Sequence, residues 1–237
     1  KCYCTILAVP KPGAAPGVWR LAHDLRAVNA ITGMDYFGLP DPCDMAYMMA
    51  GSFFITEFDF ASGYWQILVA KEDRYKTCFK LRDGRTYQWS VAPMVLKLSG
   101  VKFCRFVIEV VWDLLHKTVE AFSDNIFVFT KVNCLATHIA HCCEFLRRVE
   151  AAGMSLNPKK CHFAAQKLNI VGLTISQEGI AVNPEKLQAI AQCPFPLSQS
   201  AVRRLLGMAN QYRKQIYAYA DIVAPLTATH TSLRSER

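Results

Sequence analysis

The sequence lacks an uncharged hydrophobic run long enough to cross a membrane. Its longest apolar stretch, 53–70, carries Glu57 and Asp59 at its centre, and hydrocarbon strongly penalises such charges. A secretory signal is also missing, because Lys1 is followed directly by strand-like residues, as if the chain were cut from a longer polyprotein. We therefore expect no membrane association and an intracellular location, cytoplasmic or nuclear, without secretion.

Regular cysteine spacing is absent although the chain has ten cysteines. Cys142 and Cys143 are adjacent and the others are scattered, which argues against a disulfide framework or a zinc module. His138, His141 and Cys142 could share one helix face as metal ligands, but the same spacing suits ordinary packing. We expect reduced cysteines that serve as small core residues.

Acidic residues are the minority among the charged ones. Lys and Arg number 27 against 19 Asp and Glu, which gives a net charge of +8. This balance favours a polyanionic partner, while a merely basic soluble protein is an equal alternative on composition alone. The 237 residues, 52% of them hydrophobic, suffice for one sizeable core or two small subdomains and argue against disorder.

Apolar periodicity predicts an α+β fold with a sheet covered on one side by helices. One hairpin joins strands within 2–10 and 18–25, and another turns at Asp83-Gly84. A connector is predicted at 35–42 and a strand pair within 167–182. Helices are predicted over 43–49, 103–115, 135–152 and 199–216, with another that begins at Asn183-Pro184.

Two carboxylates share one face of a predicted strand. The segment 53–60, FFITEFDF, alternates so that Glu57 and Asp59 lie together. A core would exclude both, so a metal or a solvent-filled cleft is the better explanation. Further along, EAFSDNIFVFT predicts two short strands that turn around Asp124.

Several motifs occur in a specific order along the chain. They are VWRLAHDLRAVN, LP at 39–40, FFITEFDFASGYWQI, EDRYKTCF, YQW, LNPKKCHF, GLTISQEGI, NPEKLQAI, and LLGMANQYRKQI followed by APLT. In this order they resemble the reverse transcriptase of gypsy-class LTR retrotransposons, with retroviral polymerases as more distant relatives. The resemblance extends from about Leu7 to Leu226.

The resemblance implies a right-hand polymerase with an antiparallel palm sheet packed on helices. It implies an RNA/DNA primer-template duplex and deoxynucleoside triphosphates as partners, and ribonuclease H and integrase regions in a parent polyprotein. The expected parts are N-terminally truncated fingers at 1–50, palm at 51–80, a fingers/palm hairpin region at 81–100, palm at 101–165, a primer-grip strand pair at 166–182 and a thumb at 183–237.

The resemblance also implies catalytic aspartates at Asp59 and Asp124. With the backbone carbonyl of Phe60 they would hold two Mg²⁺ ions, or Mn²⁺, for nucleotidyl transfer. The family's second hairpin aspartate reads Asn125 here, which keeps an oxygen but removes a negative charge. Glu57 lies roughly 7 Å along the strand from Asp59, too far to substitute. We therefore expect weakened metal binding and a large loss of rate.

The expected nucleotide pocket is changed as well. Lys11 and Arg20 match family residues that grip the triphosphate, with an ordinary basic hairpin as the alternative. Tyr64 matches the aromatic gate against a ribose 2′-hydroxyl. The family's pocket floor reads Met94-Val95 here, and Val95 stands where the family has glycine. We expect Val95 to fill the nucleotide floor.

Nucleic-acid contacts are implied for the primer grip and the thumb. The thumb cations suit phosphates without sequence preference, whereas a solvated charge pair is an equal reading of the two palm lysines. The fingers signature Asp24, Arg26 and Asn29 is interpreted as structural. The expected contact residues are Lys159, Lys160, Gly172, Arg203, Arg204 and Lys214.

Three hypotheses follow. The chain is an RNA-directed DNA polymerase with impaired catalysis, a non-catalytic nucleic-acid-binding or co-opted interaction module, or an inert remnant. The scaffold motifs are retained, whereas the changes lie at the expected catalytic and nucleotide-binding positions. This pattern fits decay and co-option equally.

Overall fold

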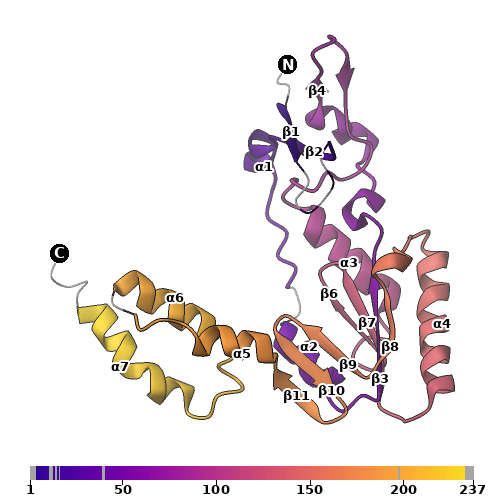
Figure 1. The fold of residues 1–237 in the computed structure, drawn as a ribbon. Helices are drawn as coiled ribbons and strands as arrows, with labels where there is room; N and C mark the ends of the chain where they lie inside the picture. Colours follow the sequence, from indigo (N-terminus) through magenta and orange to yellow (C-terminus); the bar gives the residue numbers. More distant parts are fainter. Residues whose placement is uncertain are drawn as a thin grey trace.

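The computed structural model describes residues 4–10, 13, 15, 17–38, 41–196 and 198–232 (Figure 1). Its elements in chain order are β1 (Ile6–Pro10), β2 (Trp19–His23), α1 (Arg26–Ile31), α2 (Pro42–Met49), β3 (Phe54–Asp59), η1 (Gly63–Gln66), η2 (Lys71–Thr77), β4 (Phe79–Lys80), β5 (Thr86–Tyr87), α3 (Ser99–Val111), β6 (Val119–Phe122), β7 (Asn125–Thr130), α4 (Leu135–Ala151), η3 (Pro158–Lys160), β8 (His162–Ala165), β9 (Lys167–Ile170), β10 (Leu173–Ser176), β11 (Gly179–Val182), α5 (Pro184–Ala191), α6 (Gln199–Asn210) and α7 (Tyr219–Ser232).

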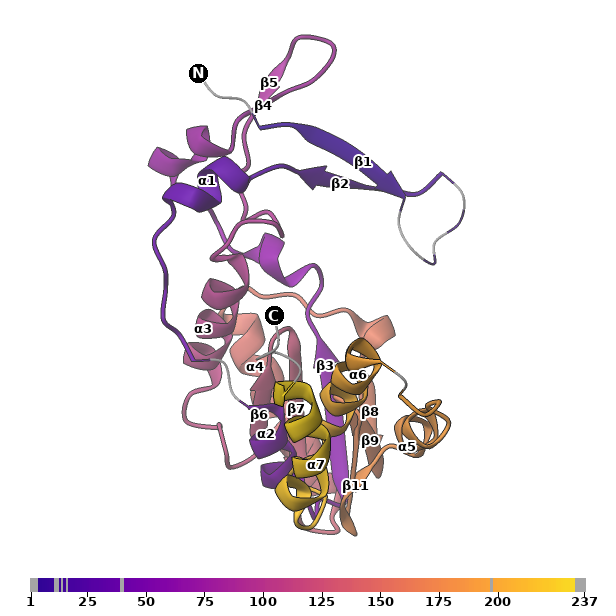
Figure 2. The ribbon, with the colours of Figure 1, turned by 90° about the vertical axis from the view of Figure 1, so that its left-hand side faces the viewer.

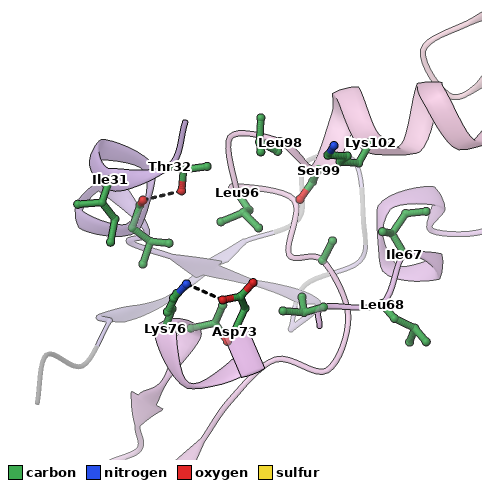
Figure 3. A pocket seen from close by; sticks show the side chains of 14 residues that line it. Ile31, Thr32, Ile67, Leu68, Asp73, Lys76, Leu96, Leu98, Ser99 and Lys102 are labelled. Atoms are coloured by element: carbon green, nitrogen blue, oxygen red, sulfur yellow. Dashed lines mark hydrogen bonds and ion pairs between the residues drawn. The ribbon is translucent and has the colours of Figure 1, made fainter. Parts of the chain in front are cut away.

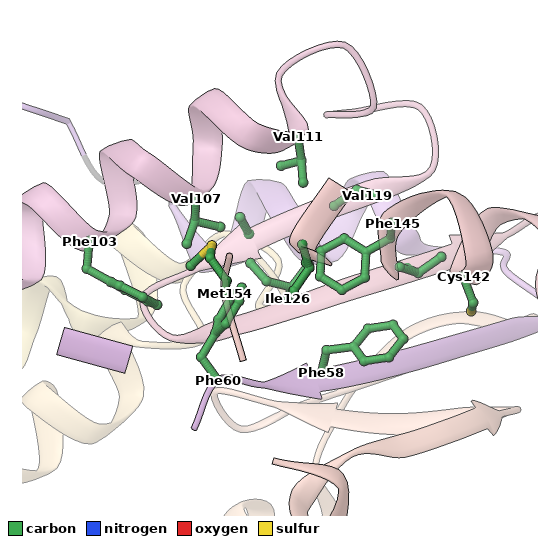
Figure 4. Close-up of a cluster of buried hydrophobic side chains, with 13 residues drawn as sticks. Phe58, Phe60, Phe103, Val107, Val111, Val119, Ile126, Cys142, Phe145 and Met154 are labelled. Atoms are coloured by element: carbon green, nitrogen blue, oxygen red, sulfur yellow. The ribbon is translucent and has the colours of Figure 1, made fainter. Parts of the chain in front are cut away.

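A four-stranded antiparallel sheet in the order β6-β7-β3-β8 forms the centre of the fold. On one face, α3 and α4 pack over it, and Figure 4 shows Phe103 of α3 and Phe145 of α4 in one cluster with Phe58 of β3. These side chains are almost fully buried. The amphipathic pattern predicted for α3 therefore correctly gives its packing on this face.

The opposite face of the sheet is also covered, so the prediction of helices on one side only was wrong. There α2 and the three-stranded sheet β11-β10-β9 pack against Ile55 and Phe127. Ile55 lies on the same face of β3 as Asp59, four residues before it. That face is consequently apolar and buried at the Ile55 end, and it carries the carboxylate at the other.

The segment KLNIVGLTIS folds as two strands, β9 and β10, where the sequence predicted one. Val171 and Gly172 both have positive φ, 49° and 83°, and form a two-residue hairpin of the type that suits twisted strands. A β-branched residue such as Val171 rarely adopts a left-handed conformation, so the sequence did not indicate a turn here. Neither the short edge strand β8 nor helix α1 was predicted, and the last predicted helix ends at Asn210 instead of 216.

The hairpins β1–β2 and β4–β5 lie beyond the Asp59 end of β3, whereas α5, α6 and α7 form a separate helical arm (Figures 1 and 2). The arm is anchored to the central part through Tyr212, which is buried in the second cluster. Lys214 adds ion pairs to Asp41 and Asp44 at 3.3 and 2.8 Å. No helix in the described residues has the length and apolar character needed to span a membrane.

His138 is a buried structural histidine. Its ring nitrogens lie 2.7 Å from Thr56 Oγ1 and 2.9 Å from Thr130 Oγ1, and His141 also contacts Thr130. Both nitrogens are thus used by hydroxyl groups. Cys142 is buried in the core cluster, as predicted. Within the described ranges, no group of three or more His, Cys, Asp and Glu side chains could hold a metal ion.

Replacement of His138 by Gln should destabilise the protein more at neutral pH than in acid. Burial lowers the pKa of His138 below its ordinary value, with a further contribution from His141. The unfolded chain therefore binds the proton first, near pH 6.5, and the stability conferred by neutral His138 is lost as the pH falls below that value. Urea unfolding at pH 7.5 and 5.5 should show the gap between wild type and His138→Gln narrowing in acid; an unchanged gap would contradict this reading.

Candidate active-site cleft

Antiparallel pairing of β3 with β7 brings the two predicted acids together. Asp59 lies directly opposite Asn125, and Asp124 occupies the two-residue turn between β6 and β7. Residues directly opposite in such a pair share one face of the sheet, with Cβ atoms about 5 Å apart. The expectation that Asp59 and Asp124 meet in one cleft is therefore met, and both line it.

Both acids are flanked by strained backbone. Ser62 and Ser123 adopt left-handed φ angles of 53° and 58° although neither is glycine. Such conformations persist where the surroundings hold them and are frequent at functional sites. At the hairpin, the buried Cys104 of α3 contacts the carbonyl of Ser123 through its thiol at 3.5 Å, which holds the turn against α3.

Asp59 is largely buried, with 13% of its side chain exposed. Its Oδ2 accepts from Lys160 Nζ at 3.1 Å, whereas its Oδ1 is buried and has no hydrogen-bond partner in the described residues. A buried carboxylate oxygen without a donor is costly unless a cation or solvent satisfies it. This oxygen is therefore a buried acceptor that no donor among the described residues satisfies.

The chain segment before Lys160 is tied to the end of β3. The amide of Asn157 donates to Asp59 O at 2.8 Å, and the amide of Ala61 donates to Ser155 O at 3.0 Å. These two bonds flank Phe60 and leave its carbonyl out of the bridge. The Phe60 ring is buried in the core, and Phe60 is also one of the residues that line the cleft.

The cleft has a volume of about 580 Å³. Tyr64 lines it from η1, with its ring edge-on to Phe103 at 5.7 Å. Gly63 makes this approach possible, since a Cβ there would lie 2.8 Å from the Phe103 ring. The lining residues are Val18, Trp19, Leu21, Asp59, Phe60, Ser62, Gly63, Tyr64, Trp65, Met94, Asp124, Asn157 and Lys160.

Glu57 is not part of this lining. It lies opposite Phe127 and His162 in the sheet. Burial raises its pKa, and the nearby Asp59 raises it further while His162 opposes the shift. The structure thus agrees that Glu57 is no substitute for the missing hairpin carboxylate.

The loop between β5 and α3 carries both residues expected at the pocket floor, but only one of them lines the cleft. Met94 lines the cleft, but Val95 is half exposed and is absent from the described lining residues. The expectation that Val95 fills the nucleotide floor is therefore not supported by its position. Instead, Asn29 fixes the loop, donating to Val95 O at 2.9 Å and accepting from Lys97 N at 2.8 Å. This gives the fingers signature the structural role that was predicted.

A second hollow of about 340 Å³ lies behind the same loop (Figure 3). Ile31, Leu96 and Leu98 supply apolar walls. Its hydroxyl groups are used internally, because Thr32 donates to Val28 O and Ser99 donates to Pro93 O. Two lysines of the lining are paired as well, Lys76 with Asp73 and Lys102 with Asp35.

The remaining predicted contacts are dispersed. Lys11 and the side chain of Arg20 lie outside the described residues. Lys159 is exposed, and Arg203 and Arg204 are exposed on α6. Lys160 donates to Asp59.

Two further predicted contact residues have roles in holding the arm. The ammonium of Lys214 is engaged by Asp41 and Asp44, as described above. Gly172 faces the buried Tyr212, whose hydroxyl lies 2.5 Å from where a Cβ on Gly172 would be. The structure therefore assigns both residues to the joint between α6 and the palm.

Residues 9–207 match the family model described as reverse transcriptase (RNA-dependent DNA polymerase). The chain belongs to the reverse transcriptase family. This reverse transcriptase domain is 30% identical over 222 residues to the retrovirus-related Pol polyprotein from transposon 297 of Drosophila melanogaster, covering 93% of the chain and 21% of that protein. It is 31% identical over 209 residues to the Pol polyprotein from transposon gypsy of the same organism, covering 88% and 20%. The domain thus spans about a fifth of these relatives.

Solved structures confirm the fold of this reverse transcriptase domain. A foamy viral protease-reverse transcriptase in complex with double-stranded DNA superposes with a TM-score of 0.82 at 20% identity, over 97% of this chain and 39% of that one. The foamy viral enzyme in complex with an RNA/DNA hybrid gives 0.74 at 19% identity, over 97% and 30%. The palm-and-fingers architecture predicted from the sequence is therefore correct.

The donor set of this domain fits one divalent cation. Asp59 offers a buried, partnerless Oδ1, Asp124 a second carboxylate, and Phe60 a carbonyl that the bridge leaves unused. Hard cations of the Mg²⁺ type prefer such oxygens. Asn125, opposite Asp59, offers an amide oxygen that carries no negative charge.

Proposed function

We propose that this chain is the reverse transcriptase domain of a retroelement Pol polyprotein, that it binds primer-template nucleic acid, and that its nucleotidyl transfer is impaired. The identity with transposon Pol polyproteins supports the lineage. The foamy viral relatives of similar fold are in complex with double-stranded DNA and with an RNA/DNA hybrid. The net charge of +8 suits the same polyanionic partner.

The proposed impairment of nucleotidyl transfer rests on one observation, the pairing of Asp59 with Asn125. When bound, divalent metal ions activate the primer hydroxyl and neutralise the triphosphate. In this chain Asp59 and Asp124 would hold one ion, and the amide opposite Asp59 weakens the charge balance for a second. Tyr64 lines the cleft beside them and would limit the space at the sugar of an incoming nucleotide.

A primer-extension assay tests this proposal directly. Oligo(dT) annealed to poly(rA) is incubated with the chain and labelled dTTP, first with Mg²⁺ and then with Mn²⁺. We expect no extension above background with Mg²⁺, because the second cation lacks a carboxylate ligand. Robust incorporation by the unaltered chain would overturn the proposed impairment.

The second candidate is a non-catalytic nucleic-acid-binding module, and the basic net charge favours it. Binding that neutralises phosphates releases counterions, so affinity should fall by on the order of 10³-fold between 50 and 200 mM salt if about six phosphates are contacted. Fluorescence anisotropy with a blunt duplex measures this slope. Binding that is absent in dilute buffer, or insensitive to salt, would instead support an inert remnant.

A further inference from the structure

The cleft around Asp59 has a wall of large apolar side chains that the metal site does not explain. Trp19 is 59% exposed and Trp65 is 46% exposed, and both line the cleft. Leu21 and Met94 line it too and are similarly exposed. Contiguous exposed apolar surface inside a cleft is typical of a binding site rather than of ordinary protein surface.

The two tryptophans come from different parts of the fold. Trp19 and Leu21 are two residues apart on β2, so their side chains share one face of the fingers hairpin. Trp65 belongs to η1, which follows directly after the end of β3 that carries Asp59. The cleft therefore has indole rings from both the fingers and the palm.

The ring of Trp65 packs against the ring of a second tryptophan, Trp89. Its ring lies 5.9 Å from the ring of Trp89, at an interplanar angle of 38°. Trp89 is itself held, because its Nε1 donates to Nδ1 of the buried His23 at 3.0 Å, and Phe79 packs against both. An indole that is fixed on one side and half exposed on the other is a pre-organised surface for stacking, since little side-chain freedom is lost on binding.

The side chains that line the cleft indicate which kind of ligand it can bind. A flat ring that stacks on indoles must also tolerate the charged groups Asp59, Asp124 and Lys160 beside them. An unpaired nucleobase fits, because both of its faces are open and it remains attached to a polar backbone. Bases inside a duplex already stack on each other and do not present their faces.

We propose that Trp19 and Trp65 bind an unpaired base of the single strand that adjoins the primer-template duplex. This inference rests on the proposed nucleic-acid binding. It adds a stacking contact that is independent of the metal ions and of the carboxylates, so an impaired active site would retain it.

Two duplexes that differ only in a single-stranded overhang test the inference. Trp19→Ala and Trp65→Ala should each weaken binding to the overhung duplex about 10-fold, the loss expected for one stacked base. Binding to the blunt duplex should stay unchanged. Trp112, 73% exposed at the end of α3 and outside the cleft lining, provides the matched control, and Trp112→Ala should alter neither affinity.

An abasic overhang separates base stacking from phosphate contacts. The unaltered chain should bind it at least as weakly as Trp65→Ala binds the normal overhang, and Trp65→Phe should recover most of the affinity that Trp65→Ala loses. Overhang affinity that is insensitive to both alanine variants, or an equal loss on the blunt duplex, would overturn the stacking site alone. A chain that binds no duplex at all would overturn the proposed function together with it.

Discussion

Asn125→Asp should raise Mg²⁺-dependent primer extension by on the order of 100-fold, the effect expected when one preorganised electrostatic group is restored at a reaction centre. The substitution places a carboxylate opposite Asp59, on the same face of the sheet and next to Asp124. It preserves the size of the side chain and leaves the β3–β7 pairing intact. Single-turnover extension with a saturating primer-template measures the gain separately from any change in binding.

Asn157→Asp is the matched control for this gain. Asn157 lines the same cleft, and its side-chain oxygen accepts from Lys159 N, a role that aspartate also fills. The control therefore adds the same negative charge to the same cleft, but away from the position opposite Asp59. Equal stimulation by both variants would mean that general charge, rather than a missing ligand, limits the reaction. No gain from Asn125→Asp would show that the damage extends beyond this ligand.

The meeting of Asp59 and Asp124 was predicted from the resemblance to reverse transcriptases, and the antiparallel pairing of β3 with β7 gives its physical basis. One acid ended an alternating strand and the other lay in a turn between two short strands. Antiparallel pairing of these segments leaves few registers in which all the apolar residues are buried. The ordered motifs then selected the reverse transcriptase architecture, and the structural relatives confirm it.

Other parts of the cleft depend on contacts between distant segments, which local patterns do not encode. Lys160 was expected as a nucleic-acid contact or a solvated charge, and its ion pair with Asp59, next to the bond from Asn157 to Asp59, was not foreseen. No role was predicted for Trp65, because its ring contact with Trp89 joins segments that lie apart in the sequence. For Val95 the sequence suggested a role that the structure does not support. A valine in place of glycine was expected to fill the nucleotide pocket, but Val95 is absent from the described residues that line the cleft.

The joint between the helical arm and the palm gives the largest expected effect on stability. Gly172 has a φ of 83°, and Tyr212 Oη lies 2.5 Å from where its Cβ would be. Gly172→Ala should therefore lower the free energy of unfolding by about 3 kcal/mol, from about 1–2 kcal/mol for the left-handed backbone and about 1–3 kcal/mol for the overlap. Urea denaturation measures the loss, and limited proteolysis should show earlier cleavage between the palm and α6.

Two further variants separate the cost of the left-handed backbone from the cost of the overlap with the Tyr212 hydroxyl. Gly153 has a φ of 68° with open space around its Cβ position, so Gly153→Ala should show the backbone cost alone. Tyr212→Phe removes the overlapping hydroxyl, and the next atom of that ring, Cζ, lies 3.4 Å away. Gly172→Ala combined with Tyr212→Phe should accordingly lose less stability than the sum of the single variants. Strict additivity would mean that the tyrosine hydroxyl does not meet the new methyl group, and that Tyr212 anchors the arm through its ring alone.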